Sequence, residues 1–157
     1  MNVVAPSCLT VVLLAASSLA QDDPEAAVVT LEGDVVAGVG AVTRVDNLSV
    51  ADDGSALVEV DTDNVDTAAD GAILRDGTLL VREGQALPAP AGASVGSFDS
   101  LTQDADGDIG WNLFLDGTSG NDDDSGVFFN TTLLIQEGES SNAVGLSAGT
   151  PWIGFSE

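Results

Sequence analysis

The sequence of 157 residues contains no lysine, histidine or tyrosine, and its only basic side chains are those of Arg44, Arg75 and Arg82. The sequence contains 26 acidic side chains, and together with the three arginines they give a formal net charge of −23 at pH 7. Proteins bind nucleic acids and anionic membrane surfaces through basic patches. The charge balance therefore predicts no nucleic-acid partner.

Cysteine is nearly absent, and the single Cys8 lies in a segment with the features of an export signal. Residues 1–20 carry no charged side chain, contain the apolar run LTVVLLAA and end in Ser18-Leu19-Ala20, which places small residues before the expected cleavage site. We expect residues 1–20 to be a signal peptide and the mature chain to be secreted, periplasmic or held at the cell surface. The alternative is an uncleaved membrane anchor, because about 18 apolar residues just span a bilayer.

Removal of the signal peptide would leave a mature chain without cysteine, histidine, lysine or tyrosine. Disulfides, thiolate catalysis and cysteine-based zinc sites are then excluded. Acid–base catalysis would depend on carboxylates alone. We therefore expect that the protein is not an enzyme and that it does not insert into a membrane after cleavage.

Helical patterns are missing as well, since no stretch after residue 20 keeps an apolar helical period over three turns. Aspartate (19) outnumbers glutamate (7), and 18 glycines accompany it, which is a composition of turn formers. Hydrophobic residues make up 44% of the chain, enough for the core of one small domain. These features predict an all-β fold.

The sequence after the signal segment repeats itself with a period of about 50 residues. A dipeptide anchor recurs as Glu32-Gly33, Glu83-Gly84 and Glu137-Gly138. A second anchor recurs with nearly the same period, as Val45-x-x-Leu48-Ser49, Phe98-x-x-Leu101-Thr102 and Trp152-x-x-Phe155-Ser156. Residues 70–85 align without gaps on residues 124–139, with six of 16 positions identical. Several anchors in one order at one period predict a tandem repeat.

Each repeat is expected to form four short antiparallel strands. In the second copy the residues that alternate on one face of the second strand are Ile109, Trp111, Leu113 and Leu115. Asp76-Gly77 is a typical two-residue hairpin turn, and Asn130-Thr131 is its weaker counterpart. The expected strands are 28–31; then 45–50, 55–61, 72–75 and 78–82; then 98–102, 108–116, 126–129 and 132–136; and finally 152–156.

A four-stranded unit of about 50 residues is typical of a β-propeller blade, which must stack on neighbouring units to bury both of its faces. We divide the chain into residues 1–20 (signal peptide), 21–44 (partial repeat), 45–97 (unit 1), 98–151 (unit 2) and 152–157 (start of a further repeat). Propellers close with about four to eight blades. We therefore expect either a partial array that belongs to a longer protein or an array that closes by self-association.

Two segments of the repeat have the spacing of the motif N-x-x-G-x-x-A-F. They are Asp104-x-x-Gly107-x-x-Gly110-Trp111 and Ala51-x-x-Gly54-x-x-Leu57-Val58. The first unit ends in the turn Arg82-Glu83-Gly84-Gln85. In these features most of residues 26–157 resembles the secreted bacterial tandem-repeat proteins of the N-x-x-G-x-x-A-F type, whose repeats carry an R-E-G-D-like turn. The resemblance implies export, often with a C-terminal surface anchor, and a propeller-like repeat. It implies no catalytic residue.

The sharpest candidate for chemistry is the group Asp104, Asp106 and Asp108, whose alternating carboxylates could converge on Ca²⁺. The order of an EF-hand loop is not met, because Gly107 falls between the second and third aspartates. An ordinary Asp-Gly turn is the simpler interpretation, so we assign no metal ligand and no cofactor.

Two acidic loops are expected to lie at the same end of the array, where they would attract cations or keep an exported protein soluble. Their aspartates are Asp61, Asp63, Asp66 and Asp70 in one copy, and Asp116, Asp122, Asp123 and Asp124 in the other. We expect a non-catalytic exported repeat protein with a structural or adhesive role at the cell surface, whose partners are neighbouring repeats or copies of itself. The alternative is a calcium- or carbohydrate-binding module that uses the acidic loops or Trp111, Phe128 and Phe129.

Overall fold

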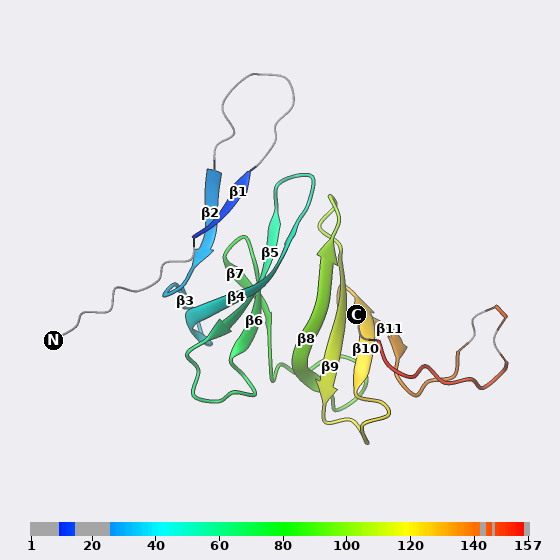
Figure 1. Cartoon of the computed structure of the whole chain (residues 1–157). Coiled ribbons are helices and arrows are strands. Elements are labelled where there is room, and N and C mark those ends of the chain that lie inside the picture. The colour runs from blue at the N-terminus through cyan, green and yellow to red at the C-terminus, as the bar shows by residue number, and fades with distance from the viewer. Residues whose placement is uncertain (1–9, 15–25, 142–143, 146, 156–157) are drawn as a thin grey trace.

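The computed structural model describes residues 10–14, 26–141, 144–145 and 147–155, and the regular structure in these ranges is eleven β-strands (Figure 1). The prediction of an all-β fold with antiparallel sheets is therefore confirmed. Within the same ranges, no helix is long and apolar enough to cross a membrane.

The first two strands form an N-terminal hairpin. Strand β1 (Thr10–Leu14) pairs antiparallel with β2 (Ala26–Leu31), and Leu14 lies opposite Ala26. Strand β2 covers the strand that was expected at residues 28–31. Strand β1 belongs to the expected signal peptide, and the rest of that segment lies outside the described residues.

Two larger sheets are antiparallel meanders in which strands adjacent in sequence are also adjacent in space. The first contains β3 (Val35–Val36), β4 (Gly40–Val50), β5 (Ala56–Thr62), β6 (Gly71–Arg75) and β7 (Thr78–Arg82). The second contains β8 (Ser94–Gln103), β9 (Ile109–Asp116), β10 (Ser125–Phe129) and β11 (Thr132–Gln136). Strands are thus present at all eight positions that were expected for the two units.

The last expected strand, at residues 152–156, is not formed in the part of the chain that the structure describes. Residues 151–155 make a single isolated bridge, in which Pro151 pairs with Ser140. Instead of entering a ladder, the backbone carbonyl of Phe155 accepts a hydrogen bond from the Asn112 side chain.

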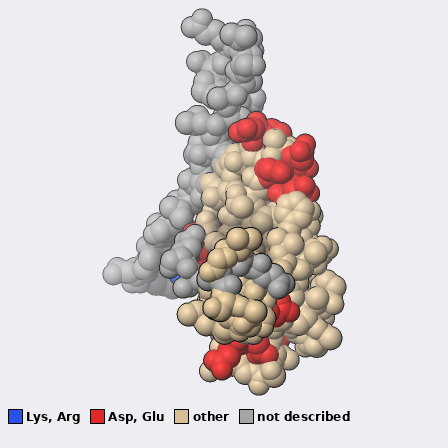
Figure 2. Space-filling model, turned by 90° about the vertical axis from the view of Figure 1, so that its right-hand side faces the viewer, with Lys and Arg blue, Asp and Glu red and all other residues tan. Residues whose placement is uncertain are grey.

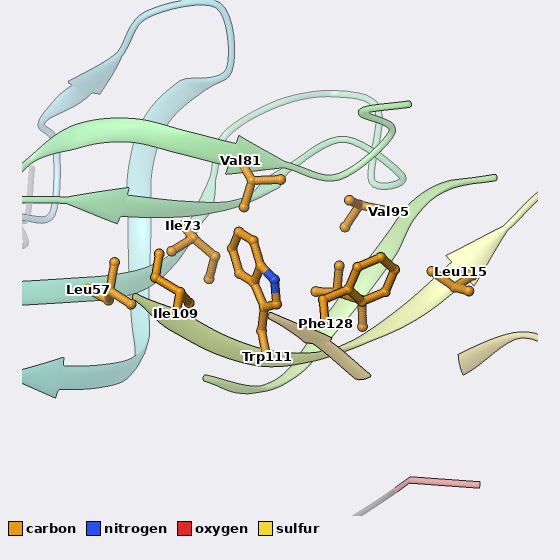
Figure 3. Packing of buried hydrophobic residues seen from close by; sticks show 9 residues of the cluster. Leu57, Ile73, Val81, Val95, Ile109, Trp111, Leu115 and Phe128 are labelled. Carbon is orange, nitrogen blue, oxygen red and sulfur yellow. The ribbon is translucent and has the colours of Figure 1, made fainter. Parts of the chain in front are cut away.

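The two meanders pack face to face, and side chains from both sheets form one hydrophobic core (Figures 1 and 3). The first sheet contributes Leu57, Ile73 and Val81, and the second contributes Val95, Ile109, Trp111, Leu113, Leu115 and Phe128. Figure 3 shows the Trp111 ring pointing across the gap toward the strands that carry Ile73 and Val81. Each sheet therefore buries the face of the other.

A second core lies on the opposite side of the first sheet. Its buried members are Val36, Val39, Val42, Val58, Val60, Ala72 and Leu74, and Val29 from β2 packs against them. One face of the sheet β3–β7 is consequently covered by the sheet β8–β11. The other is buried around Val36, Val39 and Val42, with Val29 packed against this cluster.

The turn that follows each Glu-Gly anchor makes the same pair of backbone hydrogen bonds. The glycine N–H donates to a residue further along, in the pairs Gly33–Val42, Gly84–Val95 and Gly138–Trp152, over 2.8, 2.8 and 2.9 Å. In each case the N–H of that residue donates back, to the carbonyl of Asp34, Gln85 or Glu139. Three connections along the chain therefore share one geometry.

This geometry corrects the alignment of the third anchor. Trp152 takes the place of Val95 in the hydrogen-bond pattern, whereas the sequence pattern aligned Trp152 with Phe98. The reason is the length of the connection, which is longer from Gly138 to Trp152 than from Gly84 to Val95. Phe155, rather than Trp152, therefore corresponds to Phe98.

Candidate functional site

The turn at residues 104–108 joins β8 to β9, and its first carboxylate is used by the turn itself. Asp104 Oδ1 accepts hydrogen bonds from the backbone N–H groups of Asp106 and Asp108, both at 3.0 Å. Asp108 Oδ1 accepts from Asn130 Nδ2 at 2.8 Å. These contacts are those of an aspartate-capped turn, and no group of three or more metal-ligating side chains is found in the residues that the structure describes.

Arg75 fastens this turn to the other sheet. Its Nη2 donates to the carbonyl of Gly107 at 2.5 Å, across the gap between β6 and the β8–β9 turn. Its Nε is buried and has no hydrogen-bond partner. One of only three basic side chains is thus placed between the sheets, where it also lines a cavity beside Trp111.

The two acidic loops lie at the same end of the molecule, as the meander predicts. The β5–β6 and β9–β10 loops, which hold most of the expected aspartates, are both at the lower end of the molecule in Figure 1. In the second loop the carboxylate of Asp123 accepts hydrogen bonds from Ser119 and Gly120, and these hold its pKa below the usual value. Like the carboxylate of Asp104, that of Asp123 therefore accepts hydrogen bonds from its own turn.

The most perturbed carboxylate is that of Glu59, which the sequence pattern did not single out. Glu59 lies opposite Ile73 in the ladder and so points toward the second sheet. Burial raises its pKa from 4.5 to about 7, and the charges of Asp46, Asp61 and Glu83 act in the same direction. Arg44 opposes this and is itself held by Asp46 at 2.8 Å and Asp61 at 2.6 Å.

The anchor glutamates hold the starts of β6 and β10, which are the third strands of the two expected units. Glu83 Oε2 accepts from the backbone N–H of Gly71 at 2.9 Å, and Glu137 Oε2 accepts from the hydroxyl of Ser125 at the same distance. Burial raises the pKa of Glu83, against the hydrogen bond from Gly71. Both contacts give these glutamates a structural role.

The three aromatic residues considered for ligand binding are in different environments. Trp111 and Phe128 are buried between the sheets, where Trp111 Nε1 donates to the carbonyl of Asn130 at 2.7 Å. A cavity of about 190 Å³ lies beside them, lined by Arg75, Val81 and Leu87 among others. Phe129 is instead exposed, on the far side of the second sheet.

We call this far side the outer face, meaning the face of sheet β8–β11 that points away from sheet β3–β7. The ladder places Asn112, Phe114, Ser125, Val127, Phe129 and Ile135 on it. A hollow of about 550 Å³ opens here, lined by Asp99, Thr102, Asn112, Val127 and Phe155 among others. Along β9, Phe114 lies between Leu113 and Leu115, which point into the core. The alternation that predicts the core therefore also predicts that Phe114 points to the opposite, exposed face.

The sequence matches no protein-family model, no curated protein and no solved structure. The geometry of the chain itself is therefore what indicates a function. That geometry offers turn-bound carboxylates, one partly buried glutamate and an apolar outer face.

Proposed function

We propose that the chain is a non-catalytic, exported protein built from stacked β-sheets, with a structural or adhesive role at the cell surface. The observation that carries this proposal is the core shared by the two meanders, in which each sheet supplies the cover for the face of the other. Such stacking is how repeat proteins bury units that cannot fold alone.

The proposal includes a propeller-like arrangement, in which the meanders are successive blades. Its support is the hydrogen-bond pattern that recurs after Gly33, Gly84 and Gly138. After Gly33 and Gly84 this pattern connects the last strand of one unit to the first strand of the next, and after Gly138 it connects the end of β11 to Trp152. The similarity to secreted bacterial tandem-repeat proteins of the N-x-x-G-x-x-A-F type is part of the same proposal.

A non-catalytic role is consistent with how the polar side chains are used. Asp104, Glu83 and Glu137 each accept hydrogen bonds that hold a turn or a strand end. A net charge of −23 would keep such a protein soluble outside the cell, where salt screens the repulsion.

Export is tested by expressing the whole chain in a bacterial host and locating the product. We expect protein in the periplasm or the medium, with a mass that corresponds to cleavage after Ala20. A variant with Leu13→Arg in the apolar run should remain in the cytosol with residues 1–20 attached, whereas Val65→Arg, at an exposed position, should be exported normally. Recovery of the unaltered chain in the cytosol at full length would refute export.

A further inference from the structure

The two sheets leave a cavity between them that their own side chains do not fill. It has a volume of about 190 Å³ and lies beside Trp111. Its inner wall is part of the shared core and consists of buried side chains, namely Val81, Ile109, Trp111, Leu113 and Phe128. In Figure 3, Val81 lies over the Trp111 ring, with Ile109 and Phe128 on either side of it. Protein interiors contain few voids larger than a water molecule, so a space of this size suits a ligand.

The cavity is open to solvent on one side. Gln85, Ala86 and Pro88, in the connection from β7 to β8, line the cavity and are exposed. Thr131, in the β10–β11 turn, also lines it and is exposed. A small molecule can therefore enter past these four side chains without separating the sheets.

Arg75 is the one charged residue among the described residues that line the cavity. Its Nη2 donates to the Gly107 carbonyl, whereas its Nη1 has no hydrogen-bond partner in the described part of the chain and, unlike Nε, is not fully buried. Among the described residues the ion pairs are made by Arg44, so Arg75 has no carboxylate partner either. The cavity thus combines an apolar wall with a donor that is still free to donate, as small-molecule sites commonly do.

The charge of the protein favours an uncharged ligand. The chain has a formal net charge of −23, and Figure 2 shows acidic residues gathered at the upper and lower ends of one face of the molecule. An anion would be repelled by this charge as it approaches, and a cation would meet the guanidinium of Arg75. The oxygen of an uncharged ketone or ester can accept a hydrogen bond from Arg75 without either penalty.

The volume of the cavity limits the size of the ligand. An engineered apolar cavity of about 150 Å³ in another protein takes up benzene. A cavity of about 190 Å³ therefore accommodates a six-membered ring with a small substituent.

We propose that this cavity binds a small uncharged molecule that has an apolar body and one acceptor oxygen, as a cyclic ketone has. The apolar body packs on Trp111, Leu113 and Phe128, and the oxygen accepts a hydrogen bond from the guanidinium of Arg75. The cavity is lined by residues between positions 75 and 131, so binding does not depend on export or on a role at the cell surface.

The test uses the whole chain with Trp152→Phe, in which the fluorescence of Trp111 reports a ligand beside it. The probes are cyclohexanone, which has the acceptor oxygen, and methylcyclohexane, which has a similar shape without it. We expect both probes to change the emission of Trp111 in a saturable way, with one site per chain by calorimetry. Arg75→Met should weaken the binding of cyclohexanone about tenfold more than that of methylcyclohexane, because only the ketone loses a hydrogen bond to a charged group.

A second variant tests the position of the ligand without removing Arg75. Ala86→Phe places a ring at the mouth of the cavity and should weaken the binding of both probes by about tenfold or more. The matched control is Ala68→Phe, at an exposed position that does not line the cavity, and it should leave both affinities unchanged. Far-UV circular dichroism and melting of each variant establish that it is folded.

Three results would overturn the proposal. The first is the absence of saturable binding of either probe, or binding that a folded Ala86→Phe variant leaves intact. The second is an equal effect of Arg75→Met on the two probes, which would show that Arg75 does not hold the acceptor oxygen. The third is tighter binding of cyclohexanecarboxylate than of cyclohexanone, which would show that the site selects an anion.

Discussion

Gly138 shows that a connecting turn can require glycine at a particular position. Its φ is +78°, a conformation that residues with a Cβ rarely adopt, and a Cβ built there would lie 2.5 Å from the carbonyl oxygen of Asp122. We expect Gly138→Ala to lower the free energy of unfolding by about 2–3 kcal/mol, through backbone strain and this overlap. Urea denaturation measures the change.

The matched control is Gly120→Ala, because a Cβ at Gly120 would meet no atom within 4 Å and its φ is not in the left-handed region. That variant should be as stable as the original chain or slightly more stable. Equal effects of the two substitutions would show that the turn at Gly138 is not formed as described.

Glu59 makes stability depend on pH. Below pH 4.5 the carboxyl is protonated in the folded and the unfolded chain alike. Between pH 4.5 and about 7 the folded chain holds more protons, because burial has raised the pKa of Glu59, and stability falls as the pH rises. Above about pH 7 the group is ionised in both states and the loss of stability is complete.

We therefore expect Glu59→Gln to stabilise the protein at pH 8 and to leave its stability unchanged near pH 4. The full pKa shift corresponds to about 3 kcal/mol, and screening at this partly exposed site reduces the expected gain to about 1–2 kcal/mol. Thermal melting at both pH values measures it. Glu32→Gln, at an exposed position, removes the same charge and should show no such difference between the two pH values.

At the scale of elements, the β6–β7 and β10–β11 turns share one design. Asp76 and Asn130 have φ of 49° and 53°, and their side chains accept from the N–H groups of Ala56 and Ile109, both at 2.9 Å. Asp76 thereby holds the first residue of β5, and Asn130 holds the first residue of β9. The contact therefore links three strands in each sheet. These are β5, β6 and β7 in one sheet, and β9, β10 and β11 in the other.

We expect Asn130→Ala to destabilise the chain by about 2–3 kcal/mol, because alanine is strained at this φ and leaves the Ile109 N–H without its acceptor. Asn130→Asp should recover only part of the loss. It keeps an acceptor for the Ile109 N–H, as Asp76 has for Ala56, but its carboxylate would face Asp108 Oδ1, which now accepts from Asn130 Nδ2. Thr131→Ala, at the exposed neighbouring position, is the control and should be close to neutral. If Asn130→Ala were as stable as the control, the turn would not hold the sheet in the way described.

The sequence patterns predicted these elements unevenly. Asp76-Gly77 predicted its hairpin turn. Asn130-Thr131 also forms a two-residue turn, because asparagine tolerates positive φ as Asp76 does, although Thr131, unlike Gly77, has no positive φ. The strand positions followed from alternation, which separates the two faces of a strand but does not say which face is covered. For this reason Trp111 and Phe128 were considered for a surface site although another sheet buries them.

The register of the last anchor could not be predicted from spacing. Its correct partner depends on how many residues loop out between Glu139 and Trp152, and only the backbone hydrogen bonds reveal the number. The acidic candidate at Asp104 was predicted correctly as a turn, because an Asp-x-x-Gly pattern carries its own hydrogen bonds. The raised pKa of Glu59 depends on burial in the folded chain, so the sequence pattern could not predict it.

At the scale of the whole molecule, export and the N-terminal hairpin are linked. Cleavage after Ala20 would remove β1 and leave β2 without its hairpin partner. The described members of the core that β2 joins through Val29 all lie after Ala20, so they would remain in the processed chain. The two stacked sheets are therefore the part of the structure on which the account depends.

The most direct test of that account is whether a destabilising substitution in one sheet shifts the unfolding transition of the other. In a Trp152→Phe background, Trp111 is the only tryptophan and reports unfolding of sheet β8–β11 by its fluorescence. Leu57→Ala lies in sheet β3–β7, and its fully buried side chain belongs to the core shared with Trp111. We expect this substitution to move the Trp111 transition in urea by about 2–5 kcal/mol, while Val65→Ala, fully exposed, leaves it in place. A Trp111 transition that Leu57→Ala does not move would contradict the stacking of the two sheets.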